Sequence, residues 1–293
     1  MAKSSARGRG KVVQYRAMNR ELTIAFIGGG NMASALAAGL IGKRCGAHDV
    51  HVVDVHQPTL DRWAEQGVSV ANAPGPALAQ HRVWIFAVKP QYLKQAVADC
   101  RPYLQPDTLV ISIAAGISAQ TLSQWLGSAS QPWTRLVRCM PNTPALVAAG
   151  ASGLMALGGV SQDDRGVAQQ LMRAVGEVVW VDDDAGIDAV TALSGSGPAY
   201  VFLFIEALIQ GGIKQGLSDD QARTLALATL SGATQLAALS HESLAVLRDR
   251  VTSKGGTTAA ALQVLQSQGF PDIVQQAMDA ARQRAAELSA EFS

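Results

Sequence analysis

The feature that most constrains this chain is a short, mostly apolar run that ends in three consecutive glycines. Residues 22–27 suit a strand, the glycines occupy positions 28–30, and residues 31–43 suit a helix. This order predicts a strand, a tight turn and a helix. Residues 28–33 fit the motif G-x-G-x-x-A. In this motif the first glycine allows a sharp turn, the second lets the backbone approach a pyrophosphate, and the alanine lets the helix pack closely on the sheet. We therefore predict a dinucleotide site, and a glycine-rich turn without a ligand is the alternative.

An acidic residue closes the next apolar run, and its place bears on which dinucleotide binds. Asp54 ends the run at residues 50–54, at about the 20-residue spacing from the glycines that this motif shows. An acid there accepts hydrogen bonds from both ribose hydroxyls of NAD and repels the 2′-phosphate of NADP. His56 and Arg62 lie close enough in the sequence to offset that repulsion. The residue types favour NADH, and NADPH stays open.

Further apolar runs alternate with helix-length segments as far as residue 181. The runs are continuous rather than alternating, which is typical of parallel strands covered on both faces. The expected strands are residues 83–88, 108–113, 135–139, 151–157 and 177–181, and the expected helices are residues 91–103, 119–126 and 162–175. We predict an α/β dinucleotide-binding domain over residues 22–182.

The strand patterns stop after three aspartates at residues 182–184, and the rest of the chain predicts helices. The expected helices are residues 198–215, 218–239, 256–268 and 271–288. The helix that begins at Pro198 is apolar on nearly every side, so it needs protein on every side. We expect an all-helical domain over residues 183–293 that dimerises by interleaving with a second copy. A monomeric helical bundle is the alternative.

Composition and charge exclude several classes of protein. The formal net charge of +1 argues against a nucleic-acid binder, and no apolar run approaches the roughly 18–20 residues of a membrane span. Cys45, Cys100 and Cys139 form no CxxC pair and no cluster with histidine, so we expect no disulfide scaffold, no metal and a cytoplasmic protein. Residues 1–21 are basic and lack a secretory apolar stretch. We expect a disordered tail there, or an extension ahead of a start at Met18.

Three short segments fall at the carboxyl ends of predicted strands, where open α/β sheets bind ligands. They are residues 87–90, 113–116 and 140–142. Lys89 could bind a phosphate or a substrate there, and simple solvation of its side chain is an equal alternative.

A glycine-rich turn with the sequence LSGSGPAY, residues 193–200, opens the helical half. Pro198 falls in the first turn of a helix, where its missing N–H is harmless. Ser196 or Gly197 then suits the N-cap, which is the simpler interpretation. Ser196 is also a candidate contact to a substrate.

A second glycine-rich turn, TSKGGTT at residues 252–258, precedes another helix. Paired glycines there expose backbone N–H groups that suit a carboxylate. Thr257 and Thr258 add hydroxyl groups, although an ordinary N-cap threonine is the simpler interpretation. No pairing of histidine with aspartate suggests an acid that protonates a ketone oxygen. An imine substrate removes that need, because a protonated C=N already carries the charge that attracts hydride.

Together these motifs resemble those of the Δ1-pyrroline-5-carboxylate reductase family, from about residue 22 to residue 288. The segments that carry the resemblance are residues 26–32 (FIGGGNM), 87–90 (AVKP), 112–116 (SIAAG), 138–145 (RCMPNTPA), 193–200 (LSGSGPAY) and 251–258 (VTSKGGTT). The last two are the most diagnostic, and their joint order along the chain is highly specific.

The resemblance implies a Rossmann domain followed by an all-helical domain that forms an intertwined dimer, with decamers in some members. It implies reduction of (S)-1-pyrroline-5-carboxylate to L-proline with NADPH or NADH, the last step of proline synthesis. The expected partners are therefore this small-molecule substrate and further copies of the chain. Neither nucleic acid nor a membrane is expected.

The resemblance also implies roles for individual residues. Most of the expected cofactor contacts come from the resemblance, and Asp54 is included because of its own residue type. The contacts are Ile27, Gly28, Gly29, Gly30, Asn31, Met32, Asp54, Asn72, Ala87, Val88, Lys89, Pro90, Ile113, Ala114 and Ala115. The expected substrate contacts are Ser196, Gly255, Gly256, Thr257 and Thr258. The Thr258 hydroxyl is expected to reach the ring nitrogen, which makes it the candidate catalytic residue.

Two positions depart from the family pattern. Lys254 stands where proline is usual between the serine and the glycines of the turn, which loosens the turn. Asp54, Val55 and His56 stand where many members carry a segment suited to a 2′-phosphate. A β-hydroxyacid or other 2-hydroxyacid dehydrogenase is the alternative function, but the helix after Gly197 has no lysine until Lys214 to protonate an alcohol oxygen.

Overall fold

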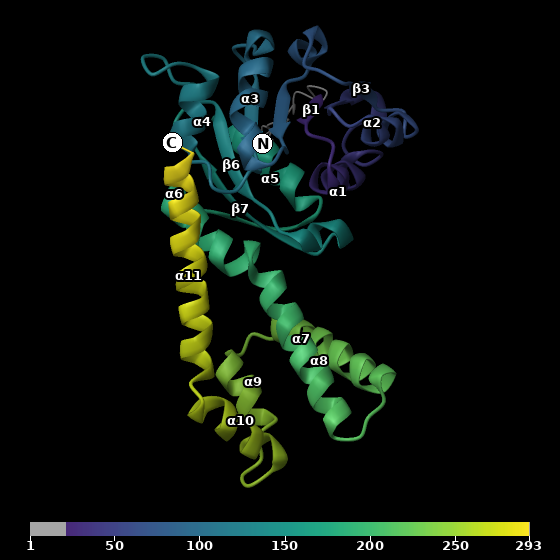
Figure 1. The fold of residues 1–293 in the computed structure, drawn as a ribbon, viewed down its shortest axis with the longest axis vertical. Coiled ribbons are helices and arrows are strands. Elements are labelled where there is room, and N and C mark those ends of the chain that lie inside the picture. Colours follow the sequence, from purple (N-terminus) through teal and green to yellow (C-terminus); the bar gives the residue numbers. More distant parts are fainter. Residues whose placement is uncertain (1–21, 293) are drawn as a thin grey trace, which may run out of the picture.

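A computed structural model describes residues 22–292 of the chain, and the predicted basic tail at residues 1–21 lies outside them. Within the described residues, eight strands form one sheet in the order β3-β2-β1-β4-β5-β6-β7-β8 (Figure 1). The strands are β1 (Ile24–Ile27), β2 (Val50–Val53), β3 (Ser69–Ala71), β4 (Val83–Phe86), β5 (Leu109–Ser112), β6 (Leu136–Met140), β7 (Gly150–Ala156) and β8 (Gly176–Trp180).

The helices fall into two groups, one between the strands and one after them. Those between the strands are α1 (Asn31–Leu40), α2 (Gln57–Ala64), α3 (Pro90–Cys100), α4 (Ala119–Leu126) and α5 (Gln162–Arg173). Those after the strands are α6 (Asp184–Val190), α7 (Gly197–Lys214), α8 (Asp219–Leu239), α9 (Leu244–Arg250), α10 (Thr257–Ser267) and α11 (Phe270–Glu291). A π-helical segment, Thr191–Gly195, joins α6 to α7.

Helices cover both faces of the sheet, as the continuous apolar strands predict. One buried cluster joins the sheet to α1 and α5 through side chains such as Leu36 and Leu171. The other joins it to α3, α4 and α6 through side chains such as Leu122 and Ile187. The predicted fold class, an α/β dinucleotide-binding domain followed by a helical domain, is confirmed. The boundary at residues 182–183 stays a prediction.

The last two strands run against the other six, which corrects the prediction of a parallel sheet. β6 and β7 pair antiparallel, and β8 is parallel to β7. The connection between β6 and β7 is residues 141–149. It is too short for a crossover, because parallel strands need a connection of about a dozen residues or more. The reversal places the start of β7 beside the carboxyl end of β6.

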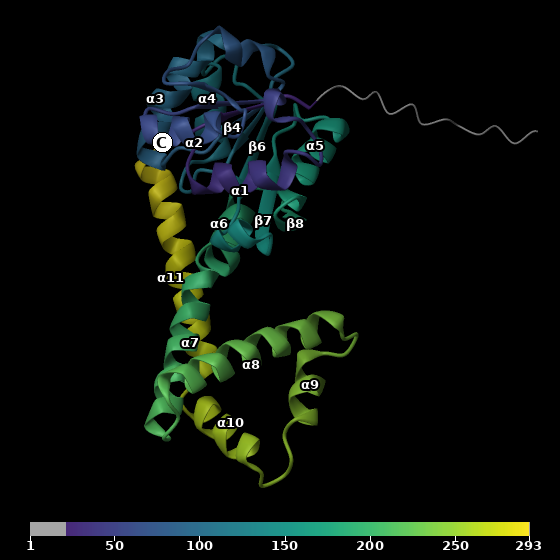
Figure 2. The same ribbon diagram turned by 90° about the vertical axis from the view of Figure 1, so that its right-hand side faces the viewer.

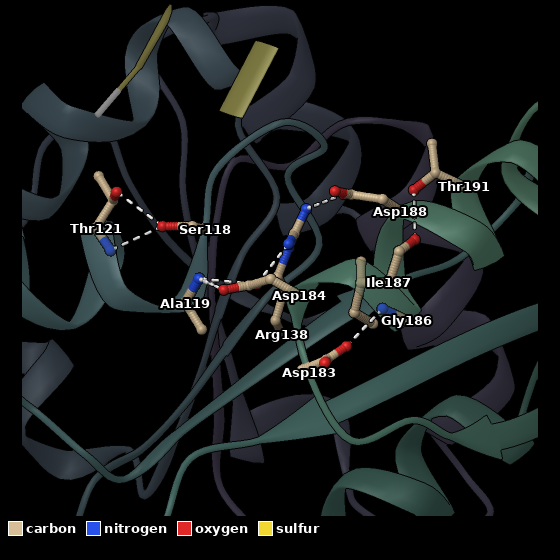
Figure 3. A network of polar contacts seen from close by, with 10 residues as sticks. All are labelled: Ser118, Ala119, Thr121, Arg138, Asp183, Asp184, Gly186, Ile187, Asp188 and Thr191. Carbon is tan, nitrogen blue, oxygen red and sulfur yellow. Dashed lines mark hydrogen bonds and ion pairs between the residues drawn. The ribbon is translucent and has the colours of Figure 1, made fainter. Parts of the chain in front are cut away.

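A buried arginine holds α6 on the sheet (Figure 3). Arg138 on β6 is 2% exposed, and its guanidinium pairs with Asp184 and Asp188. Asp184 also accepts the backbone N–H of Ala119 at the start of α4, at 3.1 Å to each carboxylate oxygen. Burial raises the pKa of Asp188, and the neighbouring Arg138 opposes that rise. This network fixes the point at which the chain leaves the sheet.

The helix that runs from α6 through the π-helical segment into α7 is largely unburied in a single chain. Phe202 is 60% exposed and Leu203 is 68% exposed. By length and composition alone the helix Asp184–Lys214 could cross a membrane, a departure from the expectation that no apolar run approaches such a span. A helix that packs against a partner chain passes the same test. The start of this one also carries two aspartates that are paired with Arg138.

The C-terminal helix brings the chain back to the sheet. In both views α7 leads away from the sheet, α9 and α10 lie at the far end, and α11 returns (Figures 1 and 2). α11 contacts α6 and the π-helical segment. A Cβ on Gly116, which has a φ of +71°, would lie 2.9 Å from the Cβ of Leu288 on α11. The helical segment therefore leaves and rejoins the sheet at neighbouring points.

Two buried histidines stack near the amino ends of β2 and β4. Their ring centroids are 5.4 Å apart with 26° between the planes. Nδ1 of His51 is 2.9 Å from the Ser69 hydroxyl, and Nδ1 of His81 is 2.8 Å from the Ala77 carbonyl oxygen. Burial lowers the pKa of both imidazoles, and His81 lowers that of His51 further.

We expect this pair to make the protein less stable in mild acid. Because both pKa values are lowered by folding, the unfolded chain binds more protons once the pH falls below about 6.5. The stabilisation is present above that pH and is lost as the pH falls toward the lowered values. Urea unfolding at about pH 7.5 and about pH 5.5 should therefore show a smaller acid-induced loss for His51→Gln than for the wild type. The exposed His241→Gln should match the wild type, and an equal loss in all three proteins would contradict the prediction.

Candidate active site

The carboxyl ends of neighbouring strands bring the predicted cofactor segments together. β1 pairs with β2 on one side and with β4 on the other, and β5 follows β4. The Ala87 N–H donates to the Ile27 carbonyl at 2.8 Å, and the Ile113 N–H donates to the Phe86 carbonyl at 3.1 Å. Open α/β sheets bind ligands where the strand order reverses, as it does at β1. The segments after β1, β4 and β5 therefore line one edge of the sheet, which we call the cofactor edge.

Each glycine of the turn after β1 has different surroundings. Gly28 has a φ of +99°, and a Cβ there would lie 2.8 Å from the backbone carbonyl of Ala87. A Cβ on Gly29 would lie 2.8 Å from Nε1 of Trp63. Gly30 has nothing within 4 Å of a Cβ position. Gly28 and Gly29 are therefore required by the fold, whereas Gly30 keeps space open beside the helix start.

The N-terminus of α1 offers backbone N–H groups to an anion. Its N-cap is Gly30, no side chain caps it, and its first turn carries no acidic residue. Gly30 and Asn31 are exposed, whereas Ala33 is buried in the core beneath the helix. A pyrophosphate suits such a helix start, because the N–H groups and the helix dipole both favour negative charge. The residues present therefore fit a dinucleotide.

Further predicted cofactor residues lie along the same edge. Asp54 follows β2 and Asn72 follows β3, and the Asp54 N–H donates to the Ala71 carbonyl at 3.1 Å. Lys89 is exposed at the N-cap of α3, and Pro90 occupies the first turn of that helix. Their contacts with a cofactor stay predictions.

A π-helical segment beside this edge leads to Ser196. Asn142, which follows β6, donates from Nδ2 to the Ser194 carbonyl at 3.0 Å and accepts the Ala151 N–H at 2.8 Å. The Ser196 N–H donates to the Thr191 carbonyl at 2.8 Å, which is the wide spacing of a π-helix. The sequence pattern predicts an N-cap at Ser196 or Gly197, and Ser196 is the N-cap of α7. Its side chain caps no N–H group, since the helix continues from α6 through the π-helical segment into α7. Glycine and serine in alternation were the only sequence signal of this irregularity.

The second glycine-rich turn also ends at an uncapped helix. α10 begins at Thr257, its N-cap is Gly256, and no side chain caps it. Gly255 has a φ of +71°, a conformation that favours glycine. The Gly256 N–H donates to the Ser253 carbonyl at 3.0 Å. The simpler interpretation, a threonine as N-cap, is therefore wrong, and the first turn of α10 presents backbone N–H groups beside the Thr258 hydroxyl.

A single chain does not bring this turn to the cofactor edge. In both views the connection between α9 and α10 lies at the end of the helical segment away from the sheet (Figures 1 and 2). Of the predicted substrate residues, Ser196 lies beside the carboxyl end of β6 through the Asn142 contact to Ser194. Residues 255–258 lie apart from it. Within one copy of the chain, the two glycine-lined turns at residues 28–30 and 255–258 therefore lie apart.

Metal and thiol chemistry find little support in the described part of the chain. Among residues 22–292, no group of three or more histidine, cysteine, aspartate or glutamate side chains could hold a metal ion. Cys45, Cys100 and Cys139 are all buried. Burial raises the pKa of the Cys100 thiol to about 12 and also raises that of Cys139. These thiols therefore stay protonated and unreactive.

Comparison with known proteins accounts for both halves of the chain. A family model described as pyrroline-5-carboxylate reductase dimerisation matches residues 184–288, and one described as NADP oxidoreductase, coenzyme F420-dependent, matches residues 23–116. The pyrroline-5-carboxylate reductase of Pseudomonas aeruginosa is 46% identical over 267 residues, covering 91% of this chain and 96% of that protein. The chain belongs to the pyrroline-5-carboxylate reductase family.

Other members of the reductase family extend the match to plants and to solved structures. The enzyme of Pisum sativum is 40% identical, covering 91% of this chain and 96% of its own length. The reductase structure from Coxiella burnetii is 38% identical with a TM-score of 0.85 and covers 91% of this chain and 98% of its own. That from Plasmodium falciparum, solved with NADP bound, is 29% identical with a TM-score of 0.78 and covers 92% and 98%. The resemblance predicted from the motifs is confirmed, which sets aside the hydroxyacid dehydrogenase alternative.

Proposed function

We propose that this protein reduces (S)-1-pyrroline-5-carboxylate to L-proline with NADPH or NADH, as the final step of proline synthesis in the cytoplasm. The observation that carries the proposal is a pair of helix N-termini, those of α1 and α10, in a chain of the reductase family. Each has glycine as its N-cap residue, and no side chain caps its backbone N–H groups. The start of α1 suits a pyrophosphate, and the start of α10 suits a small carboxylate. A reductase for a cyclic imino acid needs one site for the pyrophosphate of its cofactor and one for the carboxylate of its substrate.

The cofactor, when bound, supplies the hydride. The backbone of Gly30, Asn31 and Met32 would hold the pyrophosphate, because these residues form the open start of α1. Asp54 and Asn72 would lie on the adenosine side. Residues 87–90 and 113–115 would lie on the nicotinamide side, at the carboxyl ends of β4 and β5.

The turn before α10 would hold the substrate. Backbone N–H groups of residues 255–258 would bind the carboxylate, and the Thr258 hydroxyl would orient the ring nitrogen. Ser196, beside the cofactor edge, would complete the pocket. Because a protonated C=N already carries positive charge, no side chain has to deliver a proton to oxygen. The protein then acts mainly by positioning the reactants and excluding water.

Each active site would combine two copies of the chain. Residues 255–258 lie away from the cofactor edge of their own chain, so a partner copy would supply that turn. The exposed apolar side chains of α7, including Phe202 and Leu203, would be buried by the same partner. We propose a homodimer built in this way, which can assemble further into decamers, and neither nucleic acid nor a membrane as a partner.

Replacing Thr258 with alanine should lower kcat about tenfold or more, because one hydrogen bond worth about 1.4 kcal/mol is lost in the transition state. The measurement is steady-state oxidation of NADPH and of NADH with pyrroline-5-carboxylate. Thr258→Ser is the matched control, since it keeps the hydroxyl group and removes only a methyl group, so its kcat should stay near that of the wild type. Unchanged kcat and KM in Thr258→Ala would remove the hydroxyl from this role.

Mixing two defective variants tests the shared site. Gly30→Val blocks the cofactor edge, and Thr258→Ala impairs the substrate turn. In a mixed dimer one of the two sites combines both intact parts, so equal co-expression should restore about a quarter of wild-type activity. Each variant alone should stay well below that value. No gain on mixing, in samples shown to contain mixed dimers, would mean that each chain builds its site alone.

A further inference from the structure

We propose that Asp54 makes this site prefer NADH over NADPH, an inference that deepens the proposed function by choosing between its two cofactors. The Asp54 carboxylate is held by two backbone donors from different segments. Oδ2 accepts the N–H of Gly29 at 2.7 Å, and Oδ1 accepts the N–H of His56 at 2.9 Å. The carboxylate is thereby fixed between the glycine turn and the entry to α2.

The glycine turn cannot shift to release this carboxylate. Nε1 of Trp63 donates to the Gly29 carbonyl at 2.9 Å, so the residue that donates to Asp54 is also held through its carbonyl group. Trp63 is 2% exposed. A Cβ on Gly29 would lie 2.8 Å from Trp63 Nε1 and 2.9 Å from Cγ1 of Val52, which shows how closely the turn is enclosed. Asp54 therefore keeps its place whichever nucleotide approaches.

The chemistry of a fixed carboxylate distinguishes the two nucleotides. An ionised carboxylate only accepts hydrogen bonds and has about four lone-pair positions. Backbone donors use two of them, which leaves positions for the 2′- and 3′-hydroxyls of an adenosine ribose. A 2′-phosphate offers no donor in its place and carries a charge of about −1.5 to −2. The phosphorylated ribose therefore loses hydrogen bonds and meets a like charge.

The charged groups on α2 moderate this preference without reversing it. Nδ1 of His56 lies 3.1 Å from the Thr59 hydroxyl, and Nη2 of Arg62 donates to the same hydroxyl at 3.4 Å. Arg62 can attract a 2′-phosphate, but Asp61 on the same helix adds a second negative charge, with Gln57 donating to it at 2.7 Å. NADPH therefore stays usable, at lower affinity than NADH.

Calorimetric titration of the full-length protein with NAD⁺ and with NADP⁺ tests the inference without any substrate. The wild type should bind NAD⁺ about tenfold more tightly or better, and Asp54→Asn should reduce that ratio by about tenfold. Asp61→Asn removes the same charge from an exposed position on α2, seven residues further along the chain, and is the matched control. Its ratio should stay within about twofold of the wild type.

Two results would overturn the inference. One is a wild type that binds NADP⁺ as tightly as NAD⁺. This measurement tests the inference even if Asp54→Asn fails to fold. The other is an Asp54→Asn variant that binds both nucleotides more weakly by the same factor, since Asp54 would then only brace the turn. A preference for NAD⁺ in a protein that does not reduce pyrroline-5-carboxylate would instead refute the proposed function and leave this inference standing.

Discussion

Replacing Arg138 with methionine is expected to lower the free energy of unfolding by about 3 kcal/mol, the lower end of the range for a broken buried ion pair. Arg138 is 3% exposed in its side chain, whereas Asp184 is 33% exposed and Asp188 is 12% exposed. Both aspartates lose their cation in the variant, and the partial exposure of Asp184 limits the cost. Thermal or urea unfolding at equal protein concentration measures the effect, since oligomers are stabilised by concentration.

The pH dependence of this variant identifies the cause of its instability. The pKa of Asp188 is already raised by burial, and Arg138 holds it down. Without Arg138 the folded-state pKa rises further, so the deficit should be larger at about pH 7.5 than at about pH 5. Arg248→Met is the control, because Arg248 is 50% exposed and its partner Asp249 is 75% exposed. A loss below about 1 kcal/mol in Arg138→Met would show that the network contributes little.

The glycines at positions 28 and 30 should separate folding from cofactor binding. We expect Gly30→Ala to weaken NAD⁺ and NADP⁺ binding roughly 100-fold, or about 2.7 kcal/mol, because a Cβ would occupy the approach to α1. Its stability should change by less than about 1 kcal/mol, since the site around Gly30 is open. Fluorescence titration and urea unfolding provide the two measurements.

Gly28→Ala should instead lose stability as well as binding. A residue with a side chain is strained at a φ of +99°, and the added Cβ would lie 2.8 Å from the Ala87 backbone. The combined cost is expected to be about 2–3 kcal/mol or more. If Gly30→Ala binds both nucleotides with wild-type affinity, the pyrophosphate does not lie at the start of α1.

The parts of the fold that local patterns predicted are those with a strong local cause. The strand, glycine turn and helix at residues 22–43, and helices such as α4 and α8, follow from apolar periodicity and caps near their own residues. β3 was missed because it has only three residues, Ser69–Ala71, at the edge of the sheet. The direction of β7 was missed because it depends on the length of a loop and not on the composition of the strand.

The candidate site was predictable in its residue types but not in its arrangement. Asp54 was singled out by its place after a strand, yet its hydrogen bond from Gly29 comes from folding two segments together. Asn142 lies in the motif at residues 138–145, which predicts no role for it, because its bridge to the π-helical segment depends on tertiary contact. The distance of residues 255–258 from the cofactor edge of their own chain leaves no trace in the local sequence.

The return of α11 to the sheet gives the helical segment two supports instead of one. Arg138 holds α6 on the sheet, where the helical segment begins, and the close approach of Leu288 to Gly116 holds the end of α11 on the sheet. A segment supported at both ends cannot swing as a hinged arm, because any tilt must bend two long helices together. The loop after β5, where we propose contacts with the cofactor, and the last turns of the chain should therefore move as one body.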